Sequence, residues 1–297
     1  MSDAARAASS HAAGGATLAI ERVVLTVHNL AAMRDFYRQT VGLEPMGEEP
    51  GKALLGTGSR VLLELREDRA ARRRSAREAG LFHTAFLLPG RGDLGRWLRH
   101  AAASGLRLSG ASDHRVSEAV YLDDPEGNGI EIYVDRPAAS WRWQDGLVAM
   151  ATERMDLDGV IASGGGEEWR GAPDGTVVGH VHLQVGALPQ AEEFYTGRLG
   201  LDVTCRYPGA VFFSADGYHH HFAANVWNSR GAEPRALPST GLTEVQVALG
   251  PARLAAAARL TAQDGAGGSG RIVLSDPWGT PLVLGPLEPG RQDRAIG

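Results

Sequence analysis

An internal repeat constrains the fold of this chain more than any other feature of its sequence. Residues 21–44 and 179–202 align without a gap, at an offset of 158 positions (179 minus 21). The shared positions are apolar, aromatic and glycine residues: Val27 and Val185, Leu30 and Leu188, Phe36–Tyr37 and Phe194–Tyr195, Gly42–Leu43 and Gly200–Leu201. Such a repeat indicates that the two halves are copies, and 297 residues are enough for two domains.

Each copy begins with a short alternating strand, followed by a helix that ends at a glycine and by further apolar β-type segments. A second pattern then repeats this order within each half. Its matching segments are strands at 83–89 and 244–250, helices near 93–104 and 251–263, and Asp-Pro-x-Gly turns at 124–127 and 276–279. We therefore expect an α+β fold made of four β-α-β-β-β units, two in each half.

The repeat also predicts where the domains begin and end. The expected parts, in chain order, are a disordered tail over 1–19, a first domain over 20–135, a linker over 136–176, a second domain over 177–286 and a tail over 287–297. A Gly/Ser-rich run at 266–270 is expected to be a loop.

Composition excludes several classes of site and partner. The chain has one cysteine, Cys205, so it has no internal disulfide framework and no multi-cysteine zinc or iron–sulfur site. Its ten histidines instead indicate imidazole and carboxylate ligands for any metal. A net charge of −5 does not favour nucleic acid as a partner, and no apolar run is long enough to span a membrane. We expect a cytoplasmic protein, and a homo-oligomer is compatible with the sequence.

The four units can be compared at two equivalent positions. At the start of the first strand, units one to four carry Arg22, His83, His180 and Glu244. In the middle of the last strand, units two, three and four carry Glu131, His221 and Val283, and unit one offers Leu62, Leu63 or Glu64. Only the two middle units therefore supply metal-binding side chains at both positions.

Imidazole and carboxylate side chains at repeat-equivalent positions predict a divalent metal site. Two histidines and one carboxylate on one face of an ion, with the other positions open, is the arrangement of non-haem Fe(II) sites. Because alternate residues of a strand share a face, His182 is an alternative to His180, and His219 an alternative to His221. His220 is expected to point the opposite way. Imidazole also suits zinc, nickel and copper, so the residues alone do not identify the metal.

A longer motif connects His114 to Glu131. After His114 come five residues, an apolar residue followed by Tyr121, an Asp-Pro-x-Gly turn and then Glu131. With the repeated unit, this motif resembles the vicinal oxygen chelate superfamily, which includes glyoxalase I, bleomycin-resistance proteins and type I extradiol dioxygenases. The motif is similar to the extradiol signature, although Ser112 stands where that signature has Gly, Asn, Thr, Ile or Val. The resemblance covers roughly residues 20–286 and is closest to two-domain catechol 2,3-dioxygenases.

This resemblance implies two curved, cup-shaped mixed β-sheets and a metal site. His83, His180 and Glu131 would be the metal ligands, and the metal would be Fe(II), with Mn(II) as the alternative. Since these residues belong to units two and three, those two units would have to pair across the linker. Units one and four would pair separately.

The same resemblance implies the substrates and the remaining roles. A catechol-like vicinal diol and O₂ would be the substrates. His221, in a segment similar to the family's histidine-bearing strand, would be the acid/base beside the oxygen site. His114 would hydrogen-bond a substrate oxygen, and Tyr121 would assist at the same oxygen.

Two other functions use the same fold. A glyoxalase-type, metal-dependent isomerase or lyase would need a similar metal site but would not need His114 together with Tyr121. A non-enzymatic protein that binds an aromatic drug would have no reason to keep the three ligands together. The sequence therefore favours an extradiol ring-cleavage dioxygenase.

Overall fold

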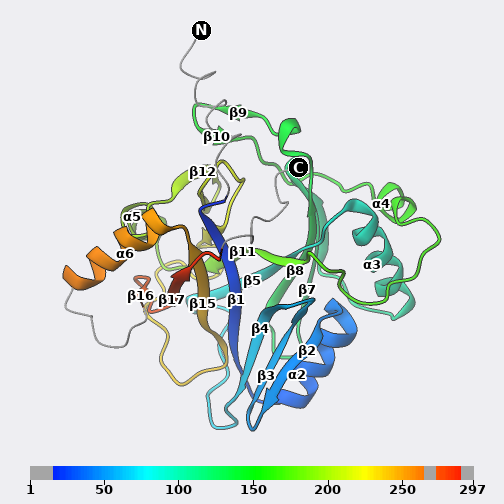
Figure 1. The fold of residues 1–297 in the computed structure, drawn as a ribbon, viewed down its shortest axis with the longest axis horizontal. Coiled ribbons are helices and arrows are strands. Elements are labelled where there is room, and N and C mark those ends of the chain that lie inside the picture. The colour runs from blue at the N-terminus through cyan, green and yellow to red at the C-terminus, as the bar shows by residue number, and fades with distance from the viewer. Residues whose placement is uncertain (1–15, 264–271, 289–297) are drawn as a thin grey trace.

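The computed structural model describes residues 16–263 and 272–288. Within these ranges the chain is a strand-rich α+β fold, with helices on the outside of curved sheets (Figure 1). The expected fold class is confirmed. The expected loop at 266–270 and most of the two expected tails lie outside the described residues.

Units one and two make up the first half. Unit one consists of β1 (Leu18–Val27), α2 (Leu30–Phe36) with a π-helical turn (Tyr37–Val41), β2 (Glu44–Glu49), β3 (Lys52–Thr57) and β4 (Arg60–Glu67). Unit two consists of β5 (Gly80–Leu87), α3 (Arg91–Ala103), β6 (Gly110–Asp113), β7 (Ser117–Asp123) and β8 (Gly129–Asp135). Both units have the expected β-α-β-β-β order, and β1 begins inside the expected tail.

Units three and four make up the second half. Unit three consists of β11 (Val177–Gln184), α5 (Leu188–Gly197), β12 (Asp202–Tyr207), β13 (Ala210–Ser214) and β14 (Phe222–Asn225). In the described part of unit four the elements are β15 (Gly241–Leu249), α6 (Pro251–Gln263), β16 (Ile272–Ser275) and β17 (Pro281–Pro286).

Strand pairing joins units from opposite halves of the chain. β5 pairs antiparallel with β11, so units two and three share one curved sheet, which we call the inner cup. β1 pairs antiparallel with β15, so units one and four share the other, the outer cup. One residue pair, Ile20 with Val178, connects the two cups through hydrogen bonding between β1 and β11. The expected site requires this pairing of units two and three.

The two faces of the inner cup differ because successive residues of a strand point to opposite sides. On β5, Phe86 belongs to the main core cluster, together with Ile132 of β8 and Trp97 of α3. Ala85 belongs instead to a small cluster with Tyr133 on the other side of the sheet. The face under α3 is therefore filled by apolar side chains, and the opposite face is left for polar ones.

The Asp-Pro-x-Gly turn fixes the start of β8. Asp124 Oδ1 accepts a hydrogen bond from the Asn128 backbone N–H at 2.9 Å, and Asp124 Oδ2 accepts one from the Tyr37 hydroxyl at 3.0 Å. Gly127 has φ of 82°, a backbone conformation that glycine adopts without steric cost. The turn therefore holds β8 in place beside β7 and β5.

The linker between the halves contains short elements of its own. They are a 3-10 turn, η2 (Ala138–Ser140), the hairpin of β9 (Trp143–Gln144) and β10 (Leu147–Val148), and α4 (Leu157–Ser163). Between β10 and α4 the chain runs along the edge of the inner cup, where Glu153 forms an isolated β-bridge with Asp113. In the described part of the chain, no helix is both long and apolar enough to cross a membrane.

Candidate active site

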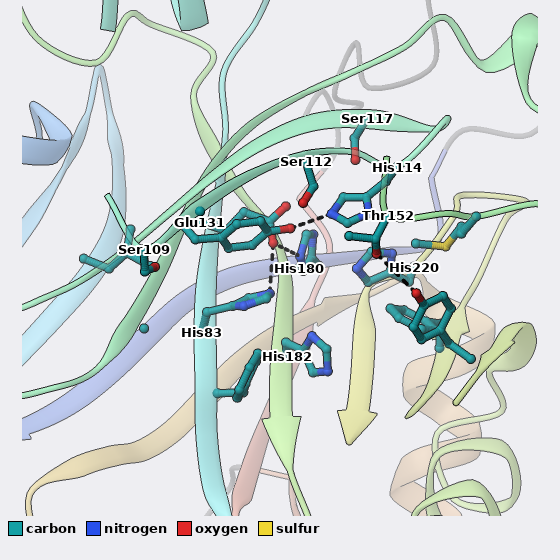
Figure 2. A pocket seen from close by; sticks show the side chains of 18 of the residues that line it. His83, Ser109, Ser112, His114, Ser117, Glu131, Thr152, His180, His182 and His220 are labelled. Atoms are coloured by element: carbon teal, nitrogen blue, oxygen red, sulfur yellow. Dashed lines mark hydrogen bonds and ion pairs between the residues drawn. The ribbon is translucent and has the colours of Figure 1, made fainter. Parts of the chain in front are cut away.

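The inner cup contains a cavity of about 370 Å³ on the face opposite α3. Its walls come from β5 to β8, from β11, from the turn before β14 and from the linker (Figure 2). This volume is typical of small-molecule sites.

Three buried side chains meet in this cavity. His83 lies on β5, Glu131 on β8 and His180 on β11, and Figure 2 shows the two imidazoles directed at the carboxylate. Glu131 Oε2 is 2.9 Å from His83 Nε2 and 3.2 Å from His180 Nε2. Ala85 pairs with Glu131 on one side and with His180 on the other. Its methyl group leaves room for the larger side chains to converge over β5.

Burial and mutual charge determine the protonation of these groups. Burial alone would raise the pKa of Glu131, but the two imidazoles outweigh it and hold that pKa well below its usual value. Burial lowers the pKa of His180 to about 4, although the Glu131 charge opposes the shift. At neutral pH Glu131 is therefore ionised and His180 is neutral, which are the forms that bind metal ions.

The donor set fits a divalent metal ion. The ligand atoms of His83, Glu131 and His180 all lie within 4.8 Å of one another. The buried Nε2 of His83 has no hydrogen bond of acceptable geometry, although the carboxylate is close. Because a buried polar atom without a partner is costly, an ion between the three side chains would remove this cost. Two imidazoles and one carboxylate also leave coordination positions open for other ligands.

His114 and Tyr121 form a second polar group in the same cavity. His114 Nε2 is 2.6 Å from the Tyr121 hydroxyl, and His114 Nδ1 is 2.6 Å from the Ala151 carbonyl oxygen. Since a carbonyl only accepts, Nδ1 of the neutral imidazole carries the proton and the Tyr121 hydroxyl donates to Nε2. Burial raises the pKa of Tyr121 well above its usual value, and the Glu131 charge adds to the shift.

The structure reverses the expected orientation of His220 and His221. His220 lines the cavity, with its ring centre 4.0 Å from that of His180. His221 is not among the cavity-lining residues, and its Nδ1 is 2.8 Å from the Ser214 hydroxyl. The expectation assumed the alternation of a strand, but β14 begins only at Phe222. The three histidines lie in the irregular turn before it, where that alternation does not apply.

His182 and His219, the two alternatives that the sequence left open, each have a hydrogen-bond partner outside the cluster of His83, Glu131 and His180. His182 lines the cavity, but its Nε2 accepts a hydrogen bond from Asn225 Nδ2 at 3.0 Å. His219 lies behind His220, and its Nε2 is 2.7 Å from Asp135 Oδ1. Of His180 and His182, it is His180 that belongs to the cluster with His83 and Glu131.

Part of the cavity wall comes from segments that sequence reasoning did not assign to the site. Met150, Ala151 and Thr152 of the linker line the cavity, and the Thr152 hydroxyl is 3.5 Å from that of Tyr207. Trp227 adds an aromatic side chain after β14. Short apolar and hydroxyl-bearing segments of this kind carry no local motif, so only the tertiary fold reveals them.

The outer cup has an ion-pair cluster at the equivalent positions. Val24 of β1 pairs with Glu64 on one side and with Glu244 on the other, so Glu64 occupies the carboxylate position that the sequence left ambiguous in unit one. Arg22 Nη1 lies 2.8 Å from Glu64 Oε2. The outer cup therefore has an arginine and two glutamates where the inner cup has two histidines and one glutamate.

Comparison with protein-family models gives the class of the protein. The model of the Glyoxalase/Bleomycin resistance protein/Dioxygenase superfamily matches residues 19–132 and 177–284. The two matched ranges contain most of the strands described above. The chain belongs to this superfamily, and the resemblance noted in its sequence is confirmed.

Individual relatives are more specific. The chain is 40% identical over 230 residues to the catechol-2,3-dioxygenase of Bacillus subtilis (strain 168), an alignment that covers 76% of this chain and 80% of that protein. It is 30% identical over 115 residues to biphenyl-2,3-diol 1,2-dioxygenase 3 of Rhodococcus globerulus, covering 38% of this chain and 60% of the relative.

Solved structures with the same fold have low sequence identity to this chain. A putative dioxygenase from Bacillus subtilis has a TM-score of 0.61 at 13% identity, covering 95% of this chain and 90% of that one. Glyoxalase I from Zea mays has a TM-score of 0.53 at 14% identity, covering 90% and 92%. At these identities the structural likeness bears on the fold alone.

Proposed function

We propose that this protein is a metal-dependent extradiol dioxygenase, which cleaves the ring of a catechol-like vicinal diol with O₂. The observation that carries the proposal is the convergence of two groups in one cavity. His83, Glu131 and His180 form a ligand set, and His114 and Tyr121 form a hydrogen-bonded pair beside it. A glyoxalase-type isomerase or lyase would need the first group and not the second. The two dioxygenase relatives support the same choice.

The three ligands would hold the ion through two imidazole nitrogens and one carboxylate. The ion would be Fe(II), with Mn(II) as the alternative, since imidazole and carboxylate suit both. When bound, it supplies Lewis acidity toward the diol and the electron transfer that O₂ chemistry requires. The aromatic lining of Phe82, Phe212 and Trp227 suits a planar ring in the same cavity.

The remaining side chains manage protons and charge. When the diol binds, the Tyr121 hydroxyl turns from His114 Nε2 to donate to a ring oxygen, and His114, once it gains a proton on Nε2, donates to the same oxygen, so that both stabilise negative charge that develops there. His220 takes over the acid/base role that the sequence suggested for His221, because it lines the cavity next to His180. Its imidazole can accept a proton from the diol and return it later to the product.

The test is reconstitution of the purified chain with Fe(II) without oxygen, followed by catechol and air. A yellow ring-opened product should appear, with one O₂ consumed per catechol. Glu131→Gln and His180→Ala should abolish product formation. His100→Ala is the matched control, since His100 lies on α3 outside the cavity and contacts the Gln39 carbonyl.

One result would contradict the proposal. Metal uptake without oxygen consumption across a panel of vicinal diols would favour an isomerase, a lyase or a binding protein. Reconstitution with Mn(II) in parallel, with the metal content measured, determines which ion supports turnover.

A further inference from the structure

Behind His220, two further polar side chains continue a hydrogen-bonded chain that the proposed function does not use. His220 Nδ1 is 2.7 Å from His219 Nδ1, and His219 Nε2 is 2.7 Å from Asp135 Oδ1. The His219 side chain is fully buried, and that of Asp135 is 13% exposed. Both ring nitrogens of His219 are therefore engaged inside the protein, where an unsatisfied polar atom would be costly.

The acceptor at one end determines the direction of each hydrogen bond. An ionised carboxylate only accepts, so His219 donates to Asp135 through Nε2–H. In a neutral imidazole the other nitrogen is then an acceptor, so His219 Nδ1 accepts from His220. His220 therefore carries its proton on Nδ1, and its Nε2 is left as a bare acceptor. The side-chain hydrogen bond described for His220 is the one at Nδ1, and the ring lines the cavity (Figure 2).

The pairing of units two and three fixes both ends of this hydrogen-bonded series of side chains. Asp135 is the last residue of β8, the strand that also carries Glu131. His219 lies in the turn before β14 and is enclosed by aromatic rings, with ring centres 4.1 Å away for Tyr218 and 5.1 Å away for Trp141. The linker thus covers His219 and keeps it between the carboxylate and the cavity.

We propose that Asp135 and His219 are positioning residues, which hold His220 in the tautomer whose Nε2 accepts protons from the cavity. The proposal rests on the proposed function, in which His220 is the acid/base. It can be tested independently of the reaction, because it concerns which nitrogen of His220 carries the proton. Neither positioning residue needs to touch the substrate.

Asp135→Asn tests the direction of the hydrogen bonds while keeping the size of the side chain. An amide carries a donor as well as an acceptor, so asparagine no longer fixes the direction of the hydrogen bond: its Oδ1 can accept from His219 Nε2–H, or its N–H can donate to His219 Nε2 and move the proton of His219 to Nδ1. In the second arrangement His220 Nδ1 has to accept and its proton moves to Nε2, so Asp135→Asn should populate both tautomers of His220. The equivalent change in the serine protease triad lowers kcat about 10⁴-fold through the wrong tautomer, which is the upper limit of the effect expected here.

The readout is the tautomer itself, measured by NMR of ¹⁵N-histidine in the full chain loaded with diamagnetic Zn(II). His220→Gln identifies the His220 signals by their loss. We expect protonated Nδ1 in the wild type and in Asp135→Glu, and a mixture of Nδ1- and Nε2-protonated His220 in Asp135→Asn. Asp158→Asn, at an exposed position on α4, should leave the His220 signals unchanged.

Turnover by the iron-loaded enzyme provides the second readout. Asp135→Asn should lower kcat several-fold with little change in KM, and Asp135→Glu should recover most of the loss. If Asp135→Asn does not fold, His219→Phe keeps the ring packing and removes both nitrogens. We then expect mixed His220 tautomers and a similar loss of kcat.

The outcomes separate this proposal from the proposed function. An unchanged His220 tautomer in Asp135→Asn or His219→Phe overturns it, as does a wild type with its proton on Nε2. A mixed tautomer population with unchanged kcat overturns the link to turnover. If no diol is cleaved by the wild type but the tautomer population changes, the positioning role stands and the dioxygenase assignment fails.

Discussion

Gly129 is the position where the smallest substitution should damage the proposed metal site most. It is the first residue of β8, and it pairs in parallel register with His83 of β5. A Cβ atom at Gly129 would collide with the Phe82 carbonyl oxygen and would lie 3.1 Å from the Cβ of His83. The absence of a side chain at this position therefore lets β5 and β8 approach closely enough to bring His83 and Glu131 together.

Gly129→Ala should push these two strands apart. The added Cβ would stand 2.1 Å from the Phe82 carbonyl oxygen, so an ordinary contact distance of ~3.5 Å requires a separation of about 1.4 Å. Overpacking of this kind typically costs about 1–3 kcal/mol of stability. The same displacement widens the 2.9 Å approach of His83 Nε2 to Glu131 Oε2. A misplacement of about 1 Å at a catalytic group lowers turnover about 10²-fold.

Three measurements on the purified variant test this reasoning: metal affinity by titration, kcat/KM after Fe(II) reconstitution, and the free energy of unfolding in urea. Gly166→Ala is the matched control, because an added Cβ there has no neighbour within 4 Å and the residue lies in the linker. We expect the control to equal the wild type in all three. Wild-type metal affinity and turnover in Gly129→Ala would refute the argument that strand separation controls the site.

Four further predictions concern the metal, its ligands and His221. Glu131→Gln should weaken metal binding by about 10²-fold or more, because it removes the one anionic ligand of the proposed set. An unchanged affinity in a titration with Fe(II) would show that Glu131 is not a ligand. Removal of the metal by a chelator should abolish turnover. Added Fe(II) should restore turnover, and Zn(II), which has no redox chemistry, should not. Activity that survives chelation would exclude a metal-dependent reaction. His221→Asn should leave kcat within about threefold. It should lower stability by about 1 kcal/mol at pH 7, because it weakens the contact with Ser214. A large loss of kcat would return the acid/base role to His221. Burial lowers the pKa of His221 from 6.5 to about 3. The stability of the wild type should therefore fall as pH drops below 6.5, by about 2 kcal/mol at pH 5. In urea unfolding at pH 7 and at pH 5, His221→Asn should lack this part of the pH dependence.

Much of the candidate site could be predicted from the sequence because the three proposed ligands lie inside regular strands. The repeat and the Asp-Pro-x-Gly turns place His83, Glu131 and His180 at equivalent positions, and strand geometry then fixes the faces that they share. The location of two ligands in unit two and one in unit three also required those units to pair. The observed pairing of β5 with β11 meets that requirement.

The remaining site residues depend on irregular backbone or on contacts distant in sequence. The histidine run precedes β14, so a two-residue alternation extended from the strand assigns the wrong face to His220 and His221. Ala151 contributes a carbonyl to His114 from 37 positions away. Asp135 and His219 meet only because β8 and the turn before β14 belong to one cup. No local pattern specifies such contacts.

The outer cup shows why the same fold and register lead to a candidate metal site in only one of the two cups. Both cups keep a buried glutamate at the same strand position, and each glutamate requires positive charge to remain ionised. In the outer cup burial alone would raise the pKa of Glu64, but Arg66, Lys52 and Arg22 outweigh it and lower that pKa. Guanidinium groups stay protonated and have no lone pair for a metal, so their charge is part of the fold. Around Glu131 the neighbours are imidazoles, which can be neutral and can share a cation with the carboxylate. The difference between the ion-pair cluster of the outer cup and the candidate metal site of the inner cup therefore comes from which side chains surround a carboxylate that both cups retain.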